Sequence, residues 1–193
     1  MRTVKGLVLA AAAALALAGC GSAADEPAPA TTGGSVLAAY DLEGLDARQV
    51  IDRLESTPVD ARARDLRASV RPGQLLLTDS RTGASTALDL PAGQFYLSIA
   101  PYVGGTHDCF NHSLTTCRGE LATERMHLTV TDRATGRALV DQDVQTFDSG
   151  FAGFWLPSGI DATVRVDHDG RTATADVSTG PDDPTCLTTM RLS

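Results

Sequence analysis

Residues 126–144 read Met126-His-Leu-Thr-Val-Thr-Asp-Arg-Ala-Thr-Gly-Arg-Ala-Leu-Val-Asp-Gln-Asp-Val144. Two runs suited to strands, 126–132 and 138–144, flank a central Arg-Ala-Thr-Gly-Arg segment whose glycine suits a turn. The pattern returns at 163–177, where two further runs flank His168-Asp169-Gly170, and Asp-Gly favours a tight hairpin. This part of the chain is therefore predicted to form antiparallel strands.

Further strand-like runs lie on both sides of this stretch. The additional strands are predicted at 74–78, 84–88, 95–102, 151–156 and 185–192. Glycine and proline separate most of them, as at Pro91 and Gly93. Short strands at regular spacing with turn signals between them indicate a small β-sandwich.

The N-terminal part of the chain carries helical signals instead. Asp46 followed by Gln49 matches a capping box, and Val50, Ile51 and Leu54 give one apolar face, so a helix is predicted over 47–55. A second helical piece is predicted over 61–69. The fold class is therefore α+β, with a small helix-plus-strand region at 36–102 followed by a mainly antiparallel β-sandwich-like domain at 103–193.

The first 35 residues are expected to be a leader and a tether. Residues 1–19 combine the basic Arg2 and Lys5 with a short apolar run, which is typical of a signal peptide. The segment ends in Leu-Ala-Gly followed by Cys20, which resembles a lipoprotein lipobox and predicts lipidation of Cys20. The composition of 20–35 predicts a flexible tether. We therefore expect an extracytoplasmic protein that is anchored to the cell membrane by lipid alone.

Charge and motifs exclude several function classes. The formal net charge is −8, and loss of the two leader cations makes the rest of the chain more acidic, which disfavours nucleic acid as a partner. The sequence lacks Gly-x-Ser-x-Gly, His-Glu-x-x-His, a phosphate loop and a dinucleotide fingerprint. We therefore expect a binding protein rather than a conventional enzyme.

The segment 107–120 contains most of the candidate chemistry. It holds Cys109, Cys117, His107 and His112, and thiolate and imidazole are the ligands that copper(I) and zinc select. Two thiols at this spacing could instead close a small structural disulfide loop, and residue types alone favour that alternative. If Cys20 carries lipid, Cys186 is the third remaining thiol, and three thiolates suit copper(I). Both readings stay open at this level.

The other polar candidates carry less weight. His112 lies inside the cysteine span and is the leading auxiliary ligand, whereas His107 is weaker. His127 is expected to be structural, and His168 is expected to be exposed in a turn. Glu120 is expected either to orient a ligand or to be an exposed charge.

The segment from His107-Asp-Cys-Phe to Thr-Cys117-Arg-Gly-Glu120 resembles the signature of the CueP family of extracytoplasmic copper-binding proteins. Similar motifs are Phe95-Tyr-Leu-Ser, the run from Thr146 to Pro157, and Asp183-Pro-Thr-Cys-Leu-Thr-Thr189. The resemblance runs from about residue 37 to the C-terminus, and the lipobox departs from the soluble periplasmic members.

The resemblance implies copper binding by Cys109, Cys117 and Cys186, with His112 as auxiliary ligand, and a role in copper homeostasis and resistance. It also implies reduction of copper(II) to copper(I), for which Cys109 and Cys117 are the expected redox thiols. A copper-accepting client protein and a homodimer are further implications. The alternatives are an extracytoplasmic thiol–disulfide exchange protein, or a binding module with a purely structural disulfide.

Overall fold

The structure is a computed structural model that describes residues 33–193. The predicted signal peptide, Cys20 and almost all of the tether lie outside the described residues. The described part is mostly antiparallel sheet with two helices, which confirms the α+β class. No helix within residues 33–193 is long and apolar enough to cross a membrane.

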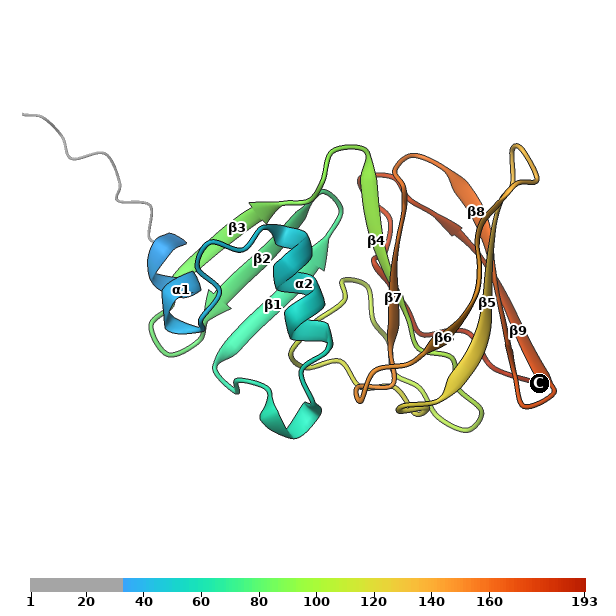
Figure 1. The fold of residues 1–193 in the computed structure, drawn as a ribbon, viewed down its shortest axis with the longest axis horizontal. Coiled ribbons are helices and arrows are strands. Elements are labelled where there is room, and N and C mark those ends of the chain that lie inside the picture. Colours follow the sequence, from blue (N-terminus) through green and yellow to red (C-terminus); the bar gives the residue numbers. More distant parts are fainter. Residues whose placement is uncertain (1–32) are drawn as a thin grey trace, which may run out of the picture. The chain divides into compact units, whose positions relative to one another are not determined.

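The N-terminal region consists of two helices on a small antiparallel sheet (Figure 1). Helices α1 (Gly33–Ala39) and α2 (Ala47–Glu55) are followed by the 3-10 turn η1 (Val59–Ala61). Strands β1 (Leu66–Arg71), β2 (Gln74–Asp79) and β3 (Ser85–Asp89) pair in that order. The Asp46 capping box at the start of α2 is present as predicted, since the Asp46 side chain accepts a hydrogen bond from the Gln49 amide.

The helix predicted over 61–69 is wrong. Only the end of η1 falls in that range, and β1 begins at Leu66. Leu66, Ala68 and Val70 are buried while the residues between them are not, which is the two-residue period of a strand. Three alternate apolar residues can be buried only in an extended conformation here, and this burial outweighs the helix propensity of the arginines.

Two sheets form the C-terminal sandwich. The first contains β4 (Gln94–Ile99), β7 (Ala152–Pro157) and the short parallel β10 (Cys186–Leu187), in the order β10-β4-β7. The second contains β5 (Arg125–Asp132), β6 (Ala138–Gln145), β8 (Asp161–His168) and β9 (Arg171–Ser178), in the order β6-β5-β8-β9. Side chains from both sheets, including Phe95, Leu128 and Val164, form one buried cluster.

The β8–β9 hairpin has the tight turn that Asp-Gly predicts. His168 pairs with Arg171, so Asp169 and Gly170 form a two-residue loop. Both residues have positive φ, 50° and 72°, as a type I′ turn requires.

The final strand, predicted over 185–192, is shorter than predicted. Only two residues form a ladder, and the Thr188 carbonyl accepts a hydrogen bond from the Thr106 hydroxyl instead.

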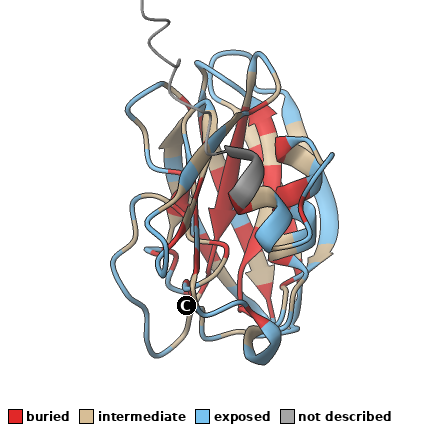
Figure 2. Cartoon of the chain, turned by 90° about the vertical axis from the view of Figure 1, so that its left-hand side faces the viewer, coloured by how far each residue is buried: buried red, intermediate tan, exposed pale blue. Residues whose placement is uncertain are grey.

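Strand β4 connects the two hydrophobic cores. Five of its six residues are buried, and successive side chains point to opposite faces. Phe95, Leu97 and Ile99 lie in the sandwich core, whereas Tyr96 packs with the N-terminal core. Figure 2 shows buried positions concentrated along the strands. The segment that follows β4 therefore begins where the two cores meet, and it contains the cysteine motif.

Candidate metal centre

The cysteine segment is held against the edge of β1. The Val70 amide donates to the His112 carbonyl at 2.8 Å, and the Leu114 amide donates to the Ala68 carbonyl at 2.9 Å. Leu114 is fully buried in the N-terminal core. The Cys117 amide then donates to the Ser113 carbonyl at 3.1 Å, which closes one helical turn. These contacts fix His112 and Cys117 on a rigid support.

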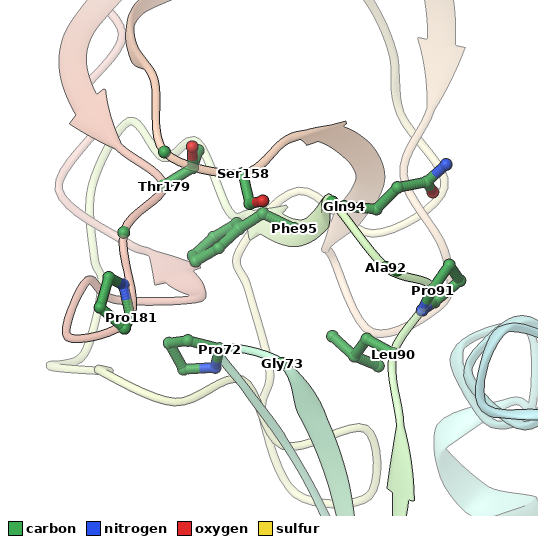
Figure 3. A pocket seen from close by; sticks show the side chains of 13 residues that line it. Pro72, Gly73, Leu90, Pro91, Ala92, Gln94, Phe95, Ser158, Thr179 and Pro181 are labelled. Atoms are coloured by element: carbon green, nitrogen blue, oxygen red, sulfur yellow. The ribbon is translucent and has the colours of Figure 1, made fainter.

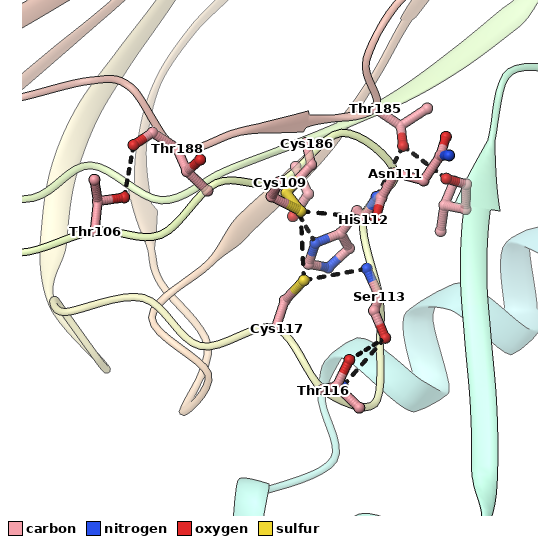
Figure 4. The surroundings of a disulfide bond; sticks show 12 residues. Thr106, Cys109, Asn111, His112, Ser113, Thr116, Cys117, Thr185, Cys186 and Thr188 are labelled. Atoms are coloured by element: carbon pink, nitrogen blue, oxygen red, sulfur yellow. Dashed lines mark hydrogen bonds between the residues drawn. A yellow bond between two sulfur atoms is a disulfide. The ribbon is translucent and has the colours of Figure 1, made fainter.

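The disulfide joins Cys109 to Cys186 (Figure 4). Their Cα atoms are 5.6 Å apart, and 77 positions separate them in the sequence. The small loop between Cys109 and Cys117, which residue types alone favoured, is therefore not formed. Strand β10 runs parallel to β4 and brings Cys186 beside the cysteine segment. The spacing of residues within 107–120 could not predict that Cys186 lies close to Cys109.

Cys117 is the one cysteine outside a disulfide among residues 33–193. Its side chain is almost buried, and its Sγ accepts a hydrogen bond from the Ser113 amide at 3.3 Å. The same sulfur lies 3.5 Å from Cys109 Sγ. A free thiol at this distance from a disulfide is positioned for thiol–disulfide exchange.

His112 is fully buried and paired with Glu55, the last residue of α2. Its Nε2 lies 3.0 Å and 3.2 Å from the two carboxylate oxygens, and Ser98 Oγ donates to the same carboxylate at 3.3 Å. Burial alone would lower the pKa of His112, but the Glu55 carboxylate and the contact with Cys117 together raise this pKa from 6.5 to about 9. The other ring nitrogen, Nδ1, is 3.8 Å from Cys186 Sγ.

Two overlapping sets of potential ligands result from this arrangement. The first contains His107, Cys109 and Cys117, and the second contains His112, Cys117 and Cys186. Within each set the ligand atoms lie within 4.8 Å of one another. Cys117 belongs to both sets. The four predicted site residues in the described chain therefore gather at one place, and the exposed His107 lies beside them.

Glu120 stabilises the loop that precedes His107. Its carboxylate accepts hydrogen bonds from the amides of Val103, Gly104 and Gly105 at 3.1, 2.9 and 2.9 Å. The sequence left its role open, and the structure shows an exposed carboxylate that fixes a loop. Nearby, Gly119 and Gly150 pack so closely that a Cβ atom on Gly119 would lie 2.5 Å from the Gly150 carbonyl oxygen.

We predict that this loop loosens only below pH 4.5. Hydrogen bonds from Gly105 and Gly104 lower the pKa of Glu120 below its ordinary 4.5. The stabilisation is therefore complete above pH 4.5 and is lost as the pH falls through the lower folded pKa. The amide NMR shifts of Gly104 and Gly105 should titrate with a midpoint below 4.5, and Glu120→Gln should abolish the transition. A midpoint at or above 4.5 would contradict the assignment.

The other two histidines lie away from the centre. His127 is half-buried, and hydrogen bonds to Asp143 and Asp141 raise its pKa. His168 was predicted to be exposed, which is wrong. It ends β8, is only 8% exposed, and its Nδ1 lies 2.8 Å from the Arg125 carbonyl, to which it donates.

Sequence reasoning missed two charged residues that contact the centre. Glu55 is 57 positions before His112, and Arg62 Nη1 donates to the Cys117 carbonyl at 3.1 Å. A signal for Glu55 was available, because it follows Ile51 by one helical turn and therefore lies on the apolar face of α2. A carboxylate on an apolar face needs a buried partner.

A cavity of about 460 Å³ lies between the turn at Pro72 and Gly73 and the adjoining end of the sandwich (Figure 3). Leu90, Pro91, Phe95 and Pro181 are among the residues that line it, and its lining contains no charged or sulfur-bearing side chain. The cavity therefore has no ligands of the kind gathered around Cys117.

Comparisons with known proteins agree with the geometry. A family model described as "Periplasmic copper-binding protein CueP" matches residues 49–191. A crystal structure described as S.CueP is similar to the chain with 36% sequence identity and a TM-score of 0.76. The match covers 82% of this chain and 96% of that one. No curated protein matches the chain.

Proposed function

The chain belongs to the CueP family of periplasmic copper-binding proteins, and from this premise we propose that copper(I) is bound by Cys109, Cys117, Cys186 and His112. The observation that carries the assignment is the buried pair of Glu55 and His112. A metal-ligating histidine usually donates its second ring N–H to a carboxylate, which fixes the orientation of the ring. Here the carboxylate holds Nε2, so Nδ1 is directed toward the sulfurs of Cys186 and Cys117.

The ligand types and the burial suit copper(I). Soft thiolates select copper(I), which is satisfied by two or three ligands, so one ion would use two or three of the four residues at a time. Cys186 and His112 are buried and Cys117 is nearly so, which limits access of water and oxygen to a bound ion. Cys109 is half-buried and His107 is exposed, so copper would enter from their side.

The oxidised centre fits the product of copper(II) reduction. In the reduced protein the thiolates of Cys109 and Cys186 each give one electron to one copper(II) ion, and a bond forms between the two sulfurs. Two copper(I) ions result, and the thiol protons pass to water. This pair replaces the expected redox pair of Cys109 and Cys117, because the structure contains the Cys109–Cys186 bond. Cys117 and His112 remain as a two-ligand site for copper(I).

A dithiol reductant would be needed to regenerate the reduced protein. The half-buried Cys109 is the more accessible sulfur of the bridge, since Cys186 is 3% exposed.

Thiol–disulfide exchange with other proteins is the second candidate function, and the 3.5 Å separation of Cys117 Sγ from Cys109 Sγ favours it. Within the chain, Cys117 can bond to Cys109 while Cys186 leaves as a thiolate. Exchange with another protein would begin when a thiolate of that protein bonds to the half-buried Cys109 and Cys186 leaves as a thiolate.

Titration of the reduced, metal-free chain with copper(I), against a chromogenic copper(I) chelator and without oxygen, tests the ligand assignment. We expect one tight site, and Cys186→Ser should weaken it by more than about 100-fold, since even partners outside the ligand shell cost about 10–100-fold. Cys20→Ser, which removes a cysteine outside the proposed ligand set, is the matched control and should bind as the parent does.

Separate measurements test the ligand set, the reduction step and the alternative function. Parental affinity in Cys186→Ser would remove Cys186 from the ligand set. Copper(II) added to the reduced protein should convert two thiols to a disulfide and yield copper(I), and thiols that stay free would contradict the reduction step. Disulfide reduction of a test protein without any effect of copper would favour exchange instead.

We further propose that the protein is a lipoprotein anchored through Cys20, and that it passes copper to a client protein. The lipobox supports the anchor, and the exposure of His107 beside the ligands supports transfer at that face. A homodimer stays a proposal.

A further inference from the structure

Another cavity, which is lined by polar and charged residues, lies next to the metal centre. Its volume is about 540 Å³, and its lining includes Arg62, Arg64, Arg67, Arg118, Thr115 and Thr116. Asp60 is the one acidic residue of the lining. The whole chain has a net charge of −8, so four arginines around one cavity are a local exception. Their guanidinium groups repel one another. Such a concentration of positive charge favours an anion.

These arginines form no close ion pair within the described part of the chain, although the carboxylates of Glu55 and Asp148 attract Arg62 from farther away. None of the four forms a salt bridge there, although Arg81, Arg133 and Arg165 each pair with an aspartate. Arg67 donates to the Arg64 carbonyl at 2.7 Å, which uses a neutral acceptor and leaves its charge unpaired. Asp60 offsets one of the four charges, so the cavity keeps an excess of positive charge.

Arg62 gives the second, independent observation. It is 9% exposed, and its Nε and Nη2 are buried and have no hydrogen-bond partner among the described residues. A buried N–H without an acceptor costs more than a satisfied one contributes, so such groups are rare in native structures. Because protein atoms cover both groups, a ligand oxygen in the cavity would provide the missing acceptor once the Arg62 side chain turns toward it.

We propose that this cavity is a binding site for a phosphate group. Guanidinium forks match two phosphate oxygens at once, and several of them together suit a doubly charged anion. The Thr115 hydroxyl accepts a hydrogen bond from the Ala68 amide and keeps its own proton for a phosphate oxygen. The phosphate is either free inorganic phosphate or the headgroup of an anionic lipid.

Occupancy of this site would reach the metal centre through Arg62. Its Nη1 donates to the Cys117 carbonyl, so an anion that draws Nε or Nη2 toward the cavity would also shift this hydrogen bond to the backbone of Cys117. The proposal does not depend on copper, since the test uses metal-free protein.

Binding of inorganic phosphate to the full metal-free chain is measured by amide NMR shifts in 150 mM NaCl, a salt concentration that screens weak surface attraction. We expect saturable shifts that include Thr116 and Arg118, and Arg118→Gln should weaken binding by about 10-fold, the equivalent of one charge-assisted hydrogen bond. Arg118 is exposed, so this variant should fold normally. Arg171→Gln is the matched control, because it removes one exposed positive charge at the far hairpin.

A second arm uses vesicles of phosphatidylglycerol and of phosphatidylcholine, with Cys20→Ser in every protein. Binding to phosphatidylglycerol that phosphate displaces and Arg118→Gln weakens indicates a lipid headgroup, whereas phosphate binding without vesicle binding indicates the free ion. Both results support the site. The proposal is overturned if neither probe binds saturably, or if Arg171→Gln weakens binding as much as Arg118→Gln.

Discussion

Reduction of the Cys109–Cys186 disulfide is expected to lower the free energy of unfolding of the metal-free protein by about 4 kcal/mol. The bridge joins residues separated by 77 positions, so it removes a large loop-closure entropy from the unfolded chain. It also attaches the short strand β10 and the C-terminal segment to the cysteine segment. Urea unfolding with and without a phosphine reductant measures the difference.

Cys117→Ser is the control for this experiment, because it keeps the bridge but has no thiol beside it. It should lose the same stability on reduction as the parent. A loss below about 1 kcal/mol in both proteins would mean that the bridge does not constrain the unfolded chain as the entropy model requires. Metal must be absent, since copper bound to the reduced thiols would stabilise the folded state.

The second large effect is expected for Glu55→Gln. Glu55 and His112 are each about 1% exposed, and removal of one partner of a buried ion pair costs about 3–5 kcal/mol. The amide has nearly the same shape but cannot hold the charge of His112. We therefore expect a loss of about 3 kcal/mol near pH 6.5, measured by urea unfolding of the metal-free, oxidised protein. Glu43→Gln changes an exposed glutamate and should alter stability by less than about 0.5 kcal/mol.

The pH dependence distinguishes loss of the ion pair from loss of packing. The folded pKa of His112, about 9, lies above its ordinary 6.5, so the pair stabilises the protein fully below pH 6.5. This contribution is lost as the pH rises toward 9. The parent should therefore lose stability over that range, whereas Glu55→Gln should not show this loss. An equal pH dependence in both proteins would contradict the ion-pair explanation.

Local patterns predicted the elements of the fold well. The α2 capping box and the β8–β9 hairpin follow from rules that act over a few residues. The prediction failed at 61–69, where burial of Leu66, Ala68 and Val70 selects a strand, and at the last strand, which shortens to Cys186–Leu187. Both failures arise because contacts distant in sequence outweigh local preference.

The sequence by itself determined which residue types are available for chemistry and where strands and turns begin. Ligand type made Cys109, Cys117, Cys186 and His112 candidate ligands, and the family resemblance implied copper as the metal. Only the tertiary structure decided how they combine. The disulfide joins Cys109 to Cys186, and Glu55 orients His112 from the end of a helix in the other core. The physical reason is that β4 is buried on both faces, so the packing of two cores against it, and not the spacing along the chain, brings these side chains together.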